Sequence, residues 1–386
     1  MSTRYVELHI IQNFAPSCLN RDDTNTPKDC EFGGVRRARI SSQCLKRAIR
    51  TDFPNYLEPD DLGVRTRQYR ALFKDRLREA GKSEDEVQTV LDAFVPALVS
   101  GLTGGTDNVI FIGGDEIAAI SDKLIAEWDE ISKTAKKGVK GKGDNKTVKE
   151  LPDKVMKGYL DLLAERSKSV DVALFGRMMA QMPKTNQEAS CQVAHAISTH
   201  AVAMDWDFYT AVDDLNPEEE SGAGMMGVIG YNSSCFYRYS VLDVRELASN
   251  LHGDEGLTKR AIDAYIRAAI DAVPSAKQNS FAAHNPPSFV FAVVREHGRP
   301  ASLTNAFEKP ANATHRQSLV ENSLERLDGY WGKLTEVYGR GGIASSAFFA
   351  VNETDFDNFG EEKKVTGKDK LVEEVIGNID LAEVEG

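Results

Sequence analysis

The sequence predicts an α+β fold, because segments with strand periodicity stand on both sides of a long stretch with helix periodicity. Near the start, Val6, Leu8 and Ile10 alternate with Glu7 and His9, which is the period of two of a half-buried strand. We place this first strand at about residues 4–11. From about residue 57 to about residue 190, apolar residues recur at helical spacing. This stretch therefore predicts a large helical insertion.

A helix is expected soon after the first strand, beyond a polar loop over residues 16–34. Ser41 or Ser42 can cap its N-terminus. Leu45, Ala48 and Ile49 follow at the spacing of an apolar stripe. Lys46 and Arg50, four residues apart, then share the other side of the helix.

The second half of the chain returns to the mixed pattern. Residues 235–242 are aromatic and β-branched enough for a strand, residues 257–273 have helical spacing, and residues 288–294 again predict a strand. The order strand, helix, insertion, strand, helix, strand fits a split βαβ, ferredoxin-like sheet. Inside the insertion, the Lys- and Gly-rich stretch from Lys133 to Lys149 predicts a mobile loop.

Composition and length indicate a globular protein of one or two domains. The chain has 386 residues, of which 41% are hydrophobic and 27% charged, which is ordinary for a folded protein. No apolar run reaches the length of a membrane span, and the start lacks the pattern of a secretory signal. We therefore expect a cytoplasmic protein. The five cysteines form no C-x-x-C pair, so neither a disulfide framework nor a metal cluster is expected.

Charge is unevenly distributed along the chain. The formal net charge of −12 argues against a nucleic-acid partner when it is taken alone. Between Val35 and Arg50, however, there are six cations and no acid, whereas the segment from Glu353 onward is dominated by acids. The basic segment is either a local anion-binding face or a solvated helix surface.

A search for catalytic patterns is largely negative. The sequence has no P-loop, no H-E-x-x-H, no G-x-S-x-G and no dinucleotide fingerprint. His195 and His200 lie close in sequence, but at a spacing of five they diverge on a helix, and an isolated histidine is more often structural. Asp22 and Asp23 are explained by hydrogen bonds to Arg21 or to the backbone. We therefore expect no enzyme, no metal and no cofactor.

The basic segment and the loop before it combine groups that suit phosphates. Backbone N–H groups at a helix N-terminus, hydroxyls, amides and cations all donate hydrogen bonds to anionic oxygens without reading base identity. The candidate contacts are Arg21, Lys28, Ser41, Ser42, Gln43, Lys46 and Arg50.

Several segments, in order, resemble one known family. They are SCLNRDD (17–23), FGGVRRARISSQCLKRA (32–48), GRM (176–178), AHAISTH (194–200), TAVDD (210–214), FYRY (236–239), AKQ (276–278) and NAFEK (305–309). Together they are closely similar to the CasC family, the Cas-seven type of guide-RNA-binding backbone subunit in type I-E CRISPR Cascade complexes. The first two segments are long and specific, whereas the central insertion and the acidic C-terminus resemble the family less.

The resemblance implies an architecture. It consists of a palm built on a modified RNA-recognition fold (1–56 and 231–386, including the acidic C-terminal segment), a helical fingers insertion (57–190) and an extended thumb (200–230).

The resemblance also implies partners: CRISPR RNA, target DNA through the guide, further copies of the chain and other Cascade subunits. The carried-over RNA contacts are Arg21, Lys28, Ser41, Gln43, Lys46, Arg50, Arg177 and Met178 of the GRM motif, and Phe208, Tyr209, Thr210 and Val212 of the thumb. Which of the aromatic residues Trp206, Phe208 and Tyr209 faces RNA stays open.

Two other interpretations remain at this point. A CRISPR RNA-processing endoribonuclease shares ferredoxin-like architecture, but it needs a general acid and a general base near the scissile phosphate. A generic single-strand-binding scaffold needs no guide.

Overall fold

The computed structural model describes residues 3–105, 108–140, 147–163, 167–179, 181–210 and 226–381. The chain divides into two compact units. The sheet unit comprises Met1–Tyr56, Cys191–Arg245 and Lys259–Glu385, and the helical unit comprises Leu57–Ser190 and Glu246–Thr258. The fold is thus a mixture of helices and antiparallel sheet.

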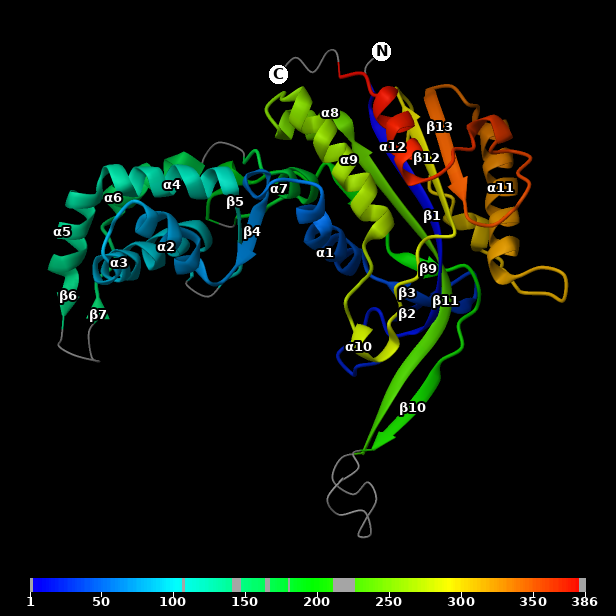
Figure 1. Cartoon of the computed structure of the whole chain (residues 1–386), viewed down its shortest axis with the longest axis horizontal. Helices are drawn as coiled ribbons and strands as arrows, with labels where there is room; N and C mark the ends of the chain where they lie inside the picture. Colours follow the sequence, from blue (N-terminus) through cyan, green and yellow to red (C-terminus); the bar gives the residue numbers. More distant parts are fainter. Residues whose placement is uncertain are drawn as a thin grey trace, which may run out of the picture. The chain divides into compact units, whose positions relative to one another are not determined.

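The sheet unit is built on an antiparallel sheet with strand order β13-β12-β1-β11-β9-β3-β2, to which β8 and β10 are added by pairing with β11 (Figure 1). The strands are β1 (Tyr5–Ser17), β2 (Asp29–Phe32), β3 (Val35–Ile40), β8 (Cys191–Val193), β9 (Ala196–Ser198), β10 (Asp205–Thr210), β11 (Met226–Asp243), β12 (Phe289–Arg295) and β13 (Ile343–Ala350). Strand β1 lies at the centre, between β11 and β12. The strands predicted at 235–242 and 288–294 are confirmed.

Strand β1 confirms the first predicted strand but is buried on both faces, not on one. Leu8 and Ile10 are buried as expected, yet Glu7 and His9 on the other face are buried as well. Glu7 forms an ion pair with Arg295 and accepts a hydrogen bond from the Tyr239 hydroxyl at 2.6 Å. Because these partners satisfy the carboxylate, a polar residue can occupy a buried strand position.

Helices cover both faces of this sheet. The helices are α1 (Ser42–Asp52), α9 (Glu255–Asp271), α10 (Gln278–Phe281), α11 (Leu319–Tyr338) and α12 (Lys368–Gly377), with short 3₁₀ turns at Phe53–Asn55, Thr304–Phe307 and Glu361–Lys363. Trp331 of α11 packs in the core beside Tyr237 and Phe291, whereas Leu45 of α1 packs with Phe236 in a second core. Helix α9 confirms the helix predicted at 257–273.

The helical unit has its own core. Its helices are α2 (Tyr69–Glu79), α3 (Glu84–Thr103), α4 (Gly114–Ala126), α5 (Trp128–Gly138), α6 (Asp153–Leu160) and α7 (Val170–Phe175), and α8 (Val244–Asn250) begins in the sheet unit and ends here. Short 3₁₀ turns occur at Pro59–Asp61, Asp161–Leu163 and Pro183–Thr185. Two small strand pairs, β4 (Gly63–Thr66) with β5 (Ile110–Gly113) and β6 (Val139–Lys140) with β7 (Thr147–Val148), complete the unit.

Two predicted loops are partly wrong. The loop expected over residues 16–34 contains the end of β1 and all of β2. Strand β2 pairs with β3 because Gly33 and Gly34, with positive φ of 62° and 74°, form the turn between them. In the stretch from Lys133 to Lys149, residues 133–138 belong to α5, where Ala135 is buried, and a strand pair follows. Residues 141–146 lie outside the described residues. Among the described helices, none is long and apolar enough to span a membrane.

Candidate nucleic-acid interface

The N-terminus of α1 is capped as the sequence predicts. Ser41 has extended backbone angles, and its hydroxyl accepts a hydrogen bond from Cys44 N at 3.4 Å. The backbone N–H of Ser41 donates to Asn20 Oδ1 at 2.8 Å, which ties the helix start to the preceding loop. Ser42 is half-buried, Gln43 is exposed, and no acid stands in the first turn. No acid in the first turn therefore opposes an anion at the positive end of the helix.

The loop that carries Arg21 is held by its own hydrogen bonds. Arg21 Nη1 donates to Asn25 Oδ1 at 2.8 Å. Asp22 Oδ1 accepts from the backbone N–H groups of Thr24 and Thr26 at 2.9 and 3.0 Å. The hydrogen bond from the Thr24 hydroxyl is the largest cause of a lowered pKa at Asp22. Hydrogen bonding of Asp22 to the backbone is thus confirmed; that it binds no metal stays a prediction.

Cations gather around this loop and the start of α1. Burial raises the pKa of the Cys44 thiol, while the nearby charges of Lys28 and Arg47 act to lower it. Burial also lowers the pKa of His195, and the charges of Arg39 and Lys28 add to that shift. Arg39 Nη1 lies 3.1 Å from His195 Nδ1. Lys28 thus lies near Cys44 together with Arg47, and near His195 together with Arg39.

Lys46 and Arg50 lie half-buried on α1. Lys46 Nζ donates to the Cys191 carbonyl oxygen at 3.4 Å. Arg50 is also not free, because it interacts with another group of the same chain. An ammonium group has three donors, so a phosphate can be bound while the Cys191 contact persists.

The six cations between Val35 and Arg50 do not form a single face. Arg37 is completely buried and donates to the carbonyl oxygens of Ser198 at 3.2 Å and Phe307 at 2.7 Å. Arg36 is exposed and forms an ion pair with Asp29. Arg37 therefore has a structural role, which explains part of the basic stretch without nucleic acid.

Three cations near this site, Arg39, Arg47 and Lys277, were not selected from the sequence as contacts. Arg47 is exposed and lines a cavity of about 430 Å³ together with Arg21, Asn25 and residues 273–276. Lys277, next to that cavity wall, has left-handed backbone angles with φ 55°. Its charge acts on Cys18, whose pKa burial raises. The sequence did carry signals for these cations, since Arg39 and Arg47 belong to the basic stretch and Lys277 belongs to the AKQ segment.

We call Arg21, Lys28, Arg39, Gln43, Lys46, Arg47 and Arg50 the basic surface. It combines side-chain donors with the N-terminus of α1. Such donors suit phosphate oxygens and carry no base identity.

A second candidate surface is the ribbon formed by β10 and residues 226–231 of β11, which we call the aromatic ribbon. Trp206 and Phe208 are each 60% exposed, and Tyr209 is 43% exposed. Trp206 pairs with Gly230 and Phe208 with Val228, so these four residues share one face, whereas Tyr209 lies on the other face. These rings therefore keep much of their surface exposed in the part of the chain that the structure describes.

The rings lie over glycines of the partner strand. A Cβ atom at Gly227 would stand 2.4 Å from Tyr209 Cζ, and one at Gly230 would stand 3.1 Å from Trp206 Cζ3 and 3.3 Å from Pro27 Cδ. The base of the aromatic ribbon thus adjoins the loop that carries Arg21 and Lys28. Thr210 pairs with Met226 at the end of β10, and the predicted contact Val212 lies outside the described residues.

The broad face of the sheet is closed to nucleic acid. His9, Tyr237, Tyr239 and Phe291 form a cluster of rings on central strands, with His9 and Tyr239 centroids 4.9 Å apart. Trp331 of α11 packs against this cluster, with its ring centroid 5.0 Å from that of Phe291. Burial, and then the charge of Arg295, lowers the pKa of His9 to about 3.

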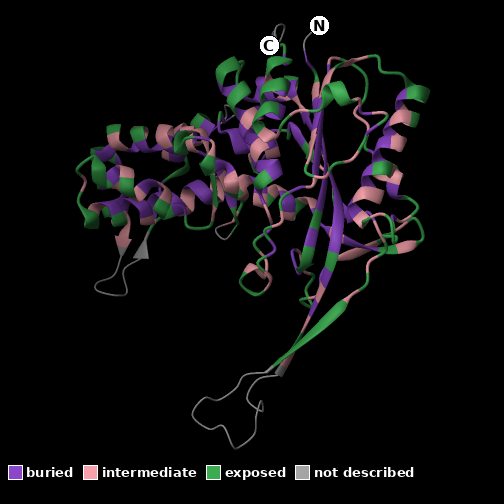
Figure 2. Ribbon diagram, turned by 45° about the vertical axis from the view of Figure 1, so that its right-hand side comes forward, coloured by how far each residue is buried: buried purple, intermediate pink, exposed green. Residues whose placement is uncertain are grey.

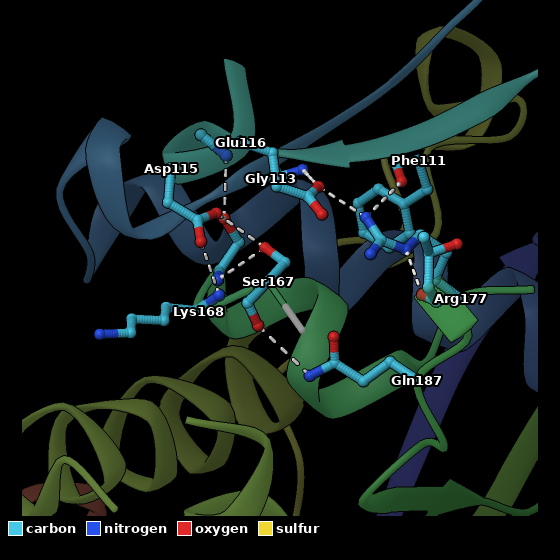
Figure 3. Close-up of polar contacts among 12 residues, drawn as sticks. Phe111, Gly113, Asp115, Glu116, Ser167, Lys168, Arg177 and Gln187 are labelled. Carbon is cyan, nitrogen blue, oxygen red and sulfur yellow. Dashed lines mark hydrogen bonds and ion pairs between the residues drawn. The ribbon is translucent and has the colours of Figure 1, made fainter. Parts of the chain in front are cut away.

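The two GRM residues selected from the sequence differ sharply in the helical unit. Met178 is 85% exposed, whereas Arg177 is 6% exposed and its guanidinium Nη1 lies 2.5 Å from Glu116 Oε2 (Figure 3). Met178 is accessible to a ligand, but the Arg177 side chain is occupied inside the unit. The prediction that Arg177 contacts RNA is untested, and its burial points to a structural role instead.

His195 and His200 have separate surroundings. His195 contacts Arg39, and in the described part of the chain no hydrogen bond joins His195 to His200. His200 Nε2 accepts from Cys235 N at 3.3 Å, and its Nδ1 lies 2.9 Å from the Ala201 carbonyl oxygen. Burial lowers the pKa of His200. In the described part of the chain, no group of three or more His, Cys, Asp or Glu side chains could hold a metal ion.

Comparison with known proteins places this architecture in a class. A solved structure described as a CRISPR RNA-guided surveillance complex, pre-nicking, contains a chain that matches with a TM-score of 0.77 and 29% identity, covering 97% of this chain and 99% of that one. A second, described as a CRISPR RNA-guided surveillance complex, matches with a TM-score of 0.61 and 24% identity over 97% and 98% of the two chains, and shows the fold alone. The chain is therefore similar to subunits of such complexes.

A family model described as CT1975-like protein matches residues 6–377. The chain belongs to this family. A comparison with curated proteins found no match.

Proposed function

We propose that the chain is a non-catalytic CRISPR RNA-binding backbone subunit of a type I-E Cascade surveillance complex in the cytoplasm. Copies assemble head to tail along the guide RNA, hold its phosphate backbone and leave spaced bases free to pair with target DNA. The 29% identity over 97% of the chain to a subunit of a CRISPR RNA-guided surveillance complex supports this proposal, and so does the family match.

The observation that carries the proposal is the basic surface at the start of α1. Ser41 caps a helix whose first turn holds no acid, and the charge of Lys28 acts with Arg47 on Cys44 and with Arg39 on His195. A guide must pair with any target, so the subunit that holds it has to recognise the phosphates and the shape of the RNA and leave the base edges free. The acidic remainder of the chain limits non-specific adsorption of RNA while this surface keeps a local positive potential.

The order of the strands supports a palm of the modified RNA-recognition type. Strands β12, β1, β11 and β9 are neighbours in that order. A ferredoxin-like β-α-β-β-α-β unit has its strands in the spatial order 4-1-3-2. The two orders correspond when β1, α1, β9, β11, α9 and β12 are taken as the six successive elements of the unit. In this proposal residues 57–190 are the fingers and residues 200–230 are the thumb. The aromatic ribbon then lies where the thumb contacts the guide.

Each copy offers only a few contacts, so affinity arises when several copies engage one RNA. Head-to-tail contacts do not close into a ring unless the rotation allows it. We therefore expect the chain to form rows of defined length on a guide, and further Cascade subunits to end those rows.

The test is to purify the chain with CRISPR RNA and the accompanying subunits, then to extract and sequence the retained RNA. Intact guides of uniform length flanked by repeat sequence are the expected result, with no preference among spacers. Cleavage of unprocessed CRISPR RNA by the purified chain would instead support the endoribonuclease. Random cellular RNA of mixed length would support a generic single-strand-binding protein.

A further inference from the structure

Met178 is the most exposed of the large apolar side chains in the described residues. It is 85% exposed, yet its neighbours Arg177 and Met179 are 6% and 4% exposed. Such a polarizable side chain in water suits an adaptable contact with a partner. The alternation of buried, exposed and buried residues also means that the direction of Met178 depends on how its neighbours are held.

The backbone on both sides of Met178 is fixed by hydrogen bonds. Arg177 N donates to Gln187 O, and Gln187 N donates to Arg177 O, each at 2.9 Å. Met179 N donates to Asn186 Oδ1 at 2.5 Å. Gly176 has φ +77°, and a Cβ there would stand 2.9 Å from Gln187 O. This segment therefore has one defined path against residues 186–187.

The Arg177 side chain ties the same segment to two further elements. Its Nε donates to Thr185 O at 3.1 Å, and its Nη1 lies 2.5 Å from Glu116 Oε2. Glu116 stands in the first turn of α4, and its Oε2 also accepts from Gly113 N at 2.7 Å. In Figure 3 the guanidinium points toward Glu116 and the Phe111 carbonyl, into the unit. The Arg177 and Glu116 side chains are 1% and 4% exposed, so this ion pair is buried away from solvent.

A buried ion pair is weak evidence for stability, but its fixed geometry can specify one conformation. The planar guanidinium reaches several acceptors in a fixed fork, which a lysine cannot reproduce. A contact residue that is held in its bound position before the partner arrives loses less freedom on binding.

We propose that Arg177 is a positioning residue, whose buried contacts with Glu116 and Thr185 hold Met178 outward as an apolar contact for the bases of the guide RNA. This inference rests on the proposed function, because it takes CRISPR RNA as the partner. It assigns Arg177 no direct contact with RNA.

The test measures oxidation of Met178 by dilute hydrogen peroxide, followed by peptide mass spectrometry, in the full chain with and without guide RNA. Oxidation of methionine follows its exposure, so bound RNA should slow the reaction of Met178 by about fivefold. In Arg177→Lys we expect less than about twofold protection, because the side chain keeps its charge but loses the fork. Arg70→Lys is the matched control, since Arg70 is an exposed arginine of the same unit paired with Asp92.

Met179 serves as an internal control, since its low exposure predicts slow oxidation in every folded variant. If Met179 becomes reactive in Arg177→Lys, the comparison is made with Glu116→Gln, which keeps an oxygen acceptor for Gly113 N but removes the charge that faces Arg177. Reduced protection of Met178 with Met179 still unreactive supports the inference.

Two results would overturn the inference alone. Equal protection in wild type and in the folded Arg177 or Glu116 variant would show that Met178 needs no positioning residue. Absence of protection in wild-type chain that has retained guide RNA would show that Met178 is not a contact, while leaving the proposed function intact. Failure of the wild-type chain to retain guide RNA would instead contradict the proposed function itself, and the inference with it.

Discussion

Strand β11 is one continuous strand whose two halves have opposite surroundings. Along the inner half, Tyr237 is 2% exposed and packs under α11. Along the outer half, Val228 is 60% exposed beside the equally exposed Phe208. Figure 2 shows the same change, with the sheet largely buried and the outer part of the β10–β11 pair exposed.

The difference teaches that aromatic and β-branched residues on a strand do not by themselves mark a binding face. Both halves carry residues with high strand propensity. The inner rings are enclosed because α11 supplies Trp331 and other apolar partners, whereas the outer rings have no covering element among the described residues. Among the described residues, the aromatic ribbon is therefore exposed, whereas the sheet face under α11 is buried.

The largest expected effect is on stability at the inner half. Tyr237→Ala should lower the free energy of unfolding by about 3–5 kcal/mol, because it leaves a cavity among buried rings. Phe208→Ala should lower it by less than about 1 kcal/mol, because the ring is mostly in water. Denaturant unfolding of both variants checks this. Equal losses would contradict the contrast between the two halves.

The second effect is on how the free energy of unfolding depends on pH. The pKa of buried His9 is about 3, below its ordinary value of 6.5, so below pH 6.5 the unfolded chain binds a proton that the native chain does not. The stability contributed by neutral His9 is therefore lost as pH falls from about 6.5 toward 3. The free energy of unfolding should have fallen by about 3 kcal/mol at about pH 4.5.

Unfolding titrations at several pH values measure this dependence. In His9→Asn the slope between about pH 6.5 and 4.5 should become shallower by nearly one proton. His315→Gln, at an exposed position, should leave the slope unchanged. A wild-type slope that His9→Asn does not alter would show that His9 is not the group responsible.

A smaller effect is expected for RNA binding by the outer half. Replacing Trp206 and Phe208 with Ala should weaken guide binding by about 1–3 kcal/mol for each base that stacks on a ring. The dependence of affinity on salt should stay the same, because neither ring carries charge. Tyr338→Ala is the control, since Tyr338 is a highly exposed aromatic residue elsewhere in the sheet unit. Undiminished binding by the double variant would remove this face of the ribbon from the RNA site.

Local patterns identified much of the fold. The period of two around Val6 and the capping serine before Leu45 depend on neighbours in sequence, and both predictions are confirmed by β1 and by Ser41. The burial of Glu7 and His9 depends on Arg295, which is 288 residues from Glu7, and on α11, which lies still further along the chain. No local period reports such a partner.

In the candidate site, too, the local sequence does not report which distant residues a side chain contacts. Arg36 and Arg37 are adjacent cations in the sequence, but only Arg37 meets the carbonyl groups of Ser198 and Phe307. Arg177 and Met178 are likewise adjacent, and only contacts with Glu116 and Thr185 distinguish the buried residue from the exposed one. Charge and motif indicate which segments matter, whereas tertiary partners decide which side chains stay available.

The central claim is that the basic surface binds the phosphate backbone of a guide without reading its sequence. Its most direct test is a salt titration of RNA binding on two unrelated spacers, comparing wild type with the double variant Lys46→Ala and Arg50→Ala. Lys333→Ala with Lys363→Ala, at exposed positions of the sheet unit, is the control, and a thermal melt checks folding.

The account predicts weaker binding by the Lys46 and Arg50 variant on both spacers alike. The slope of log affinity against log salt should flatten by about 1.4 per subunit, at roughly 0.7 for each phosphate of a single strand. The control variant should match wild type. An unchanged slope, or a loss confined to one spacer, would contradict the claim.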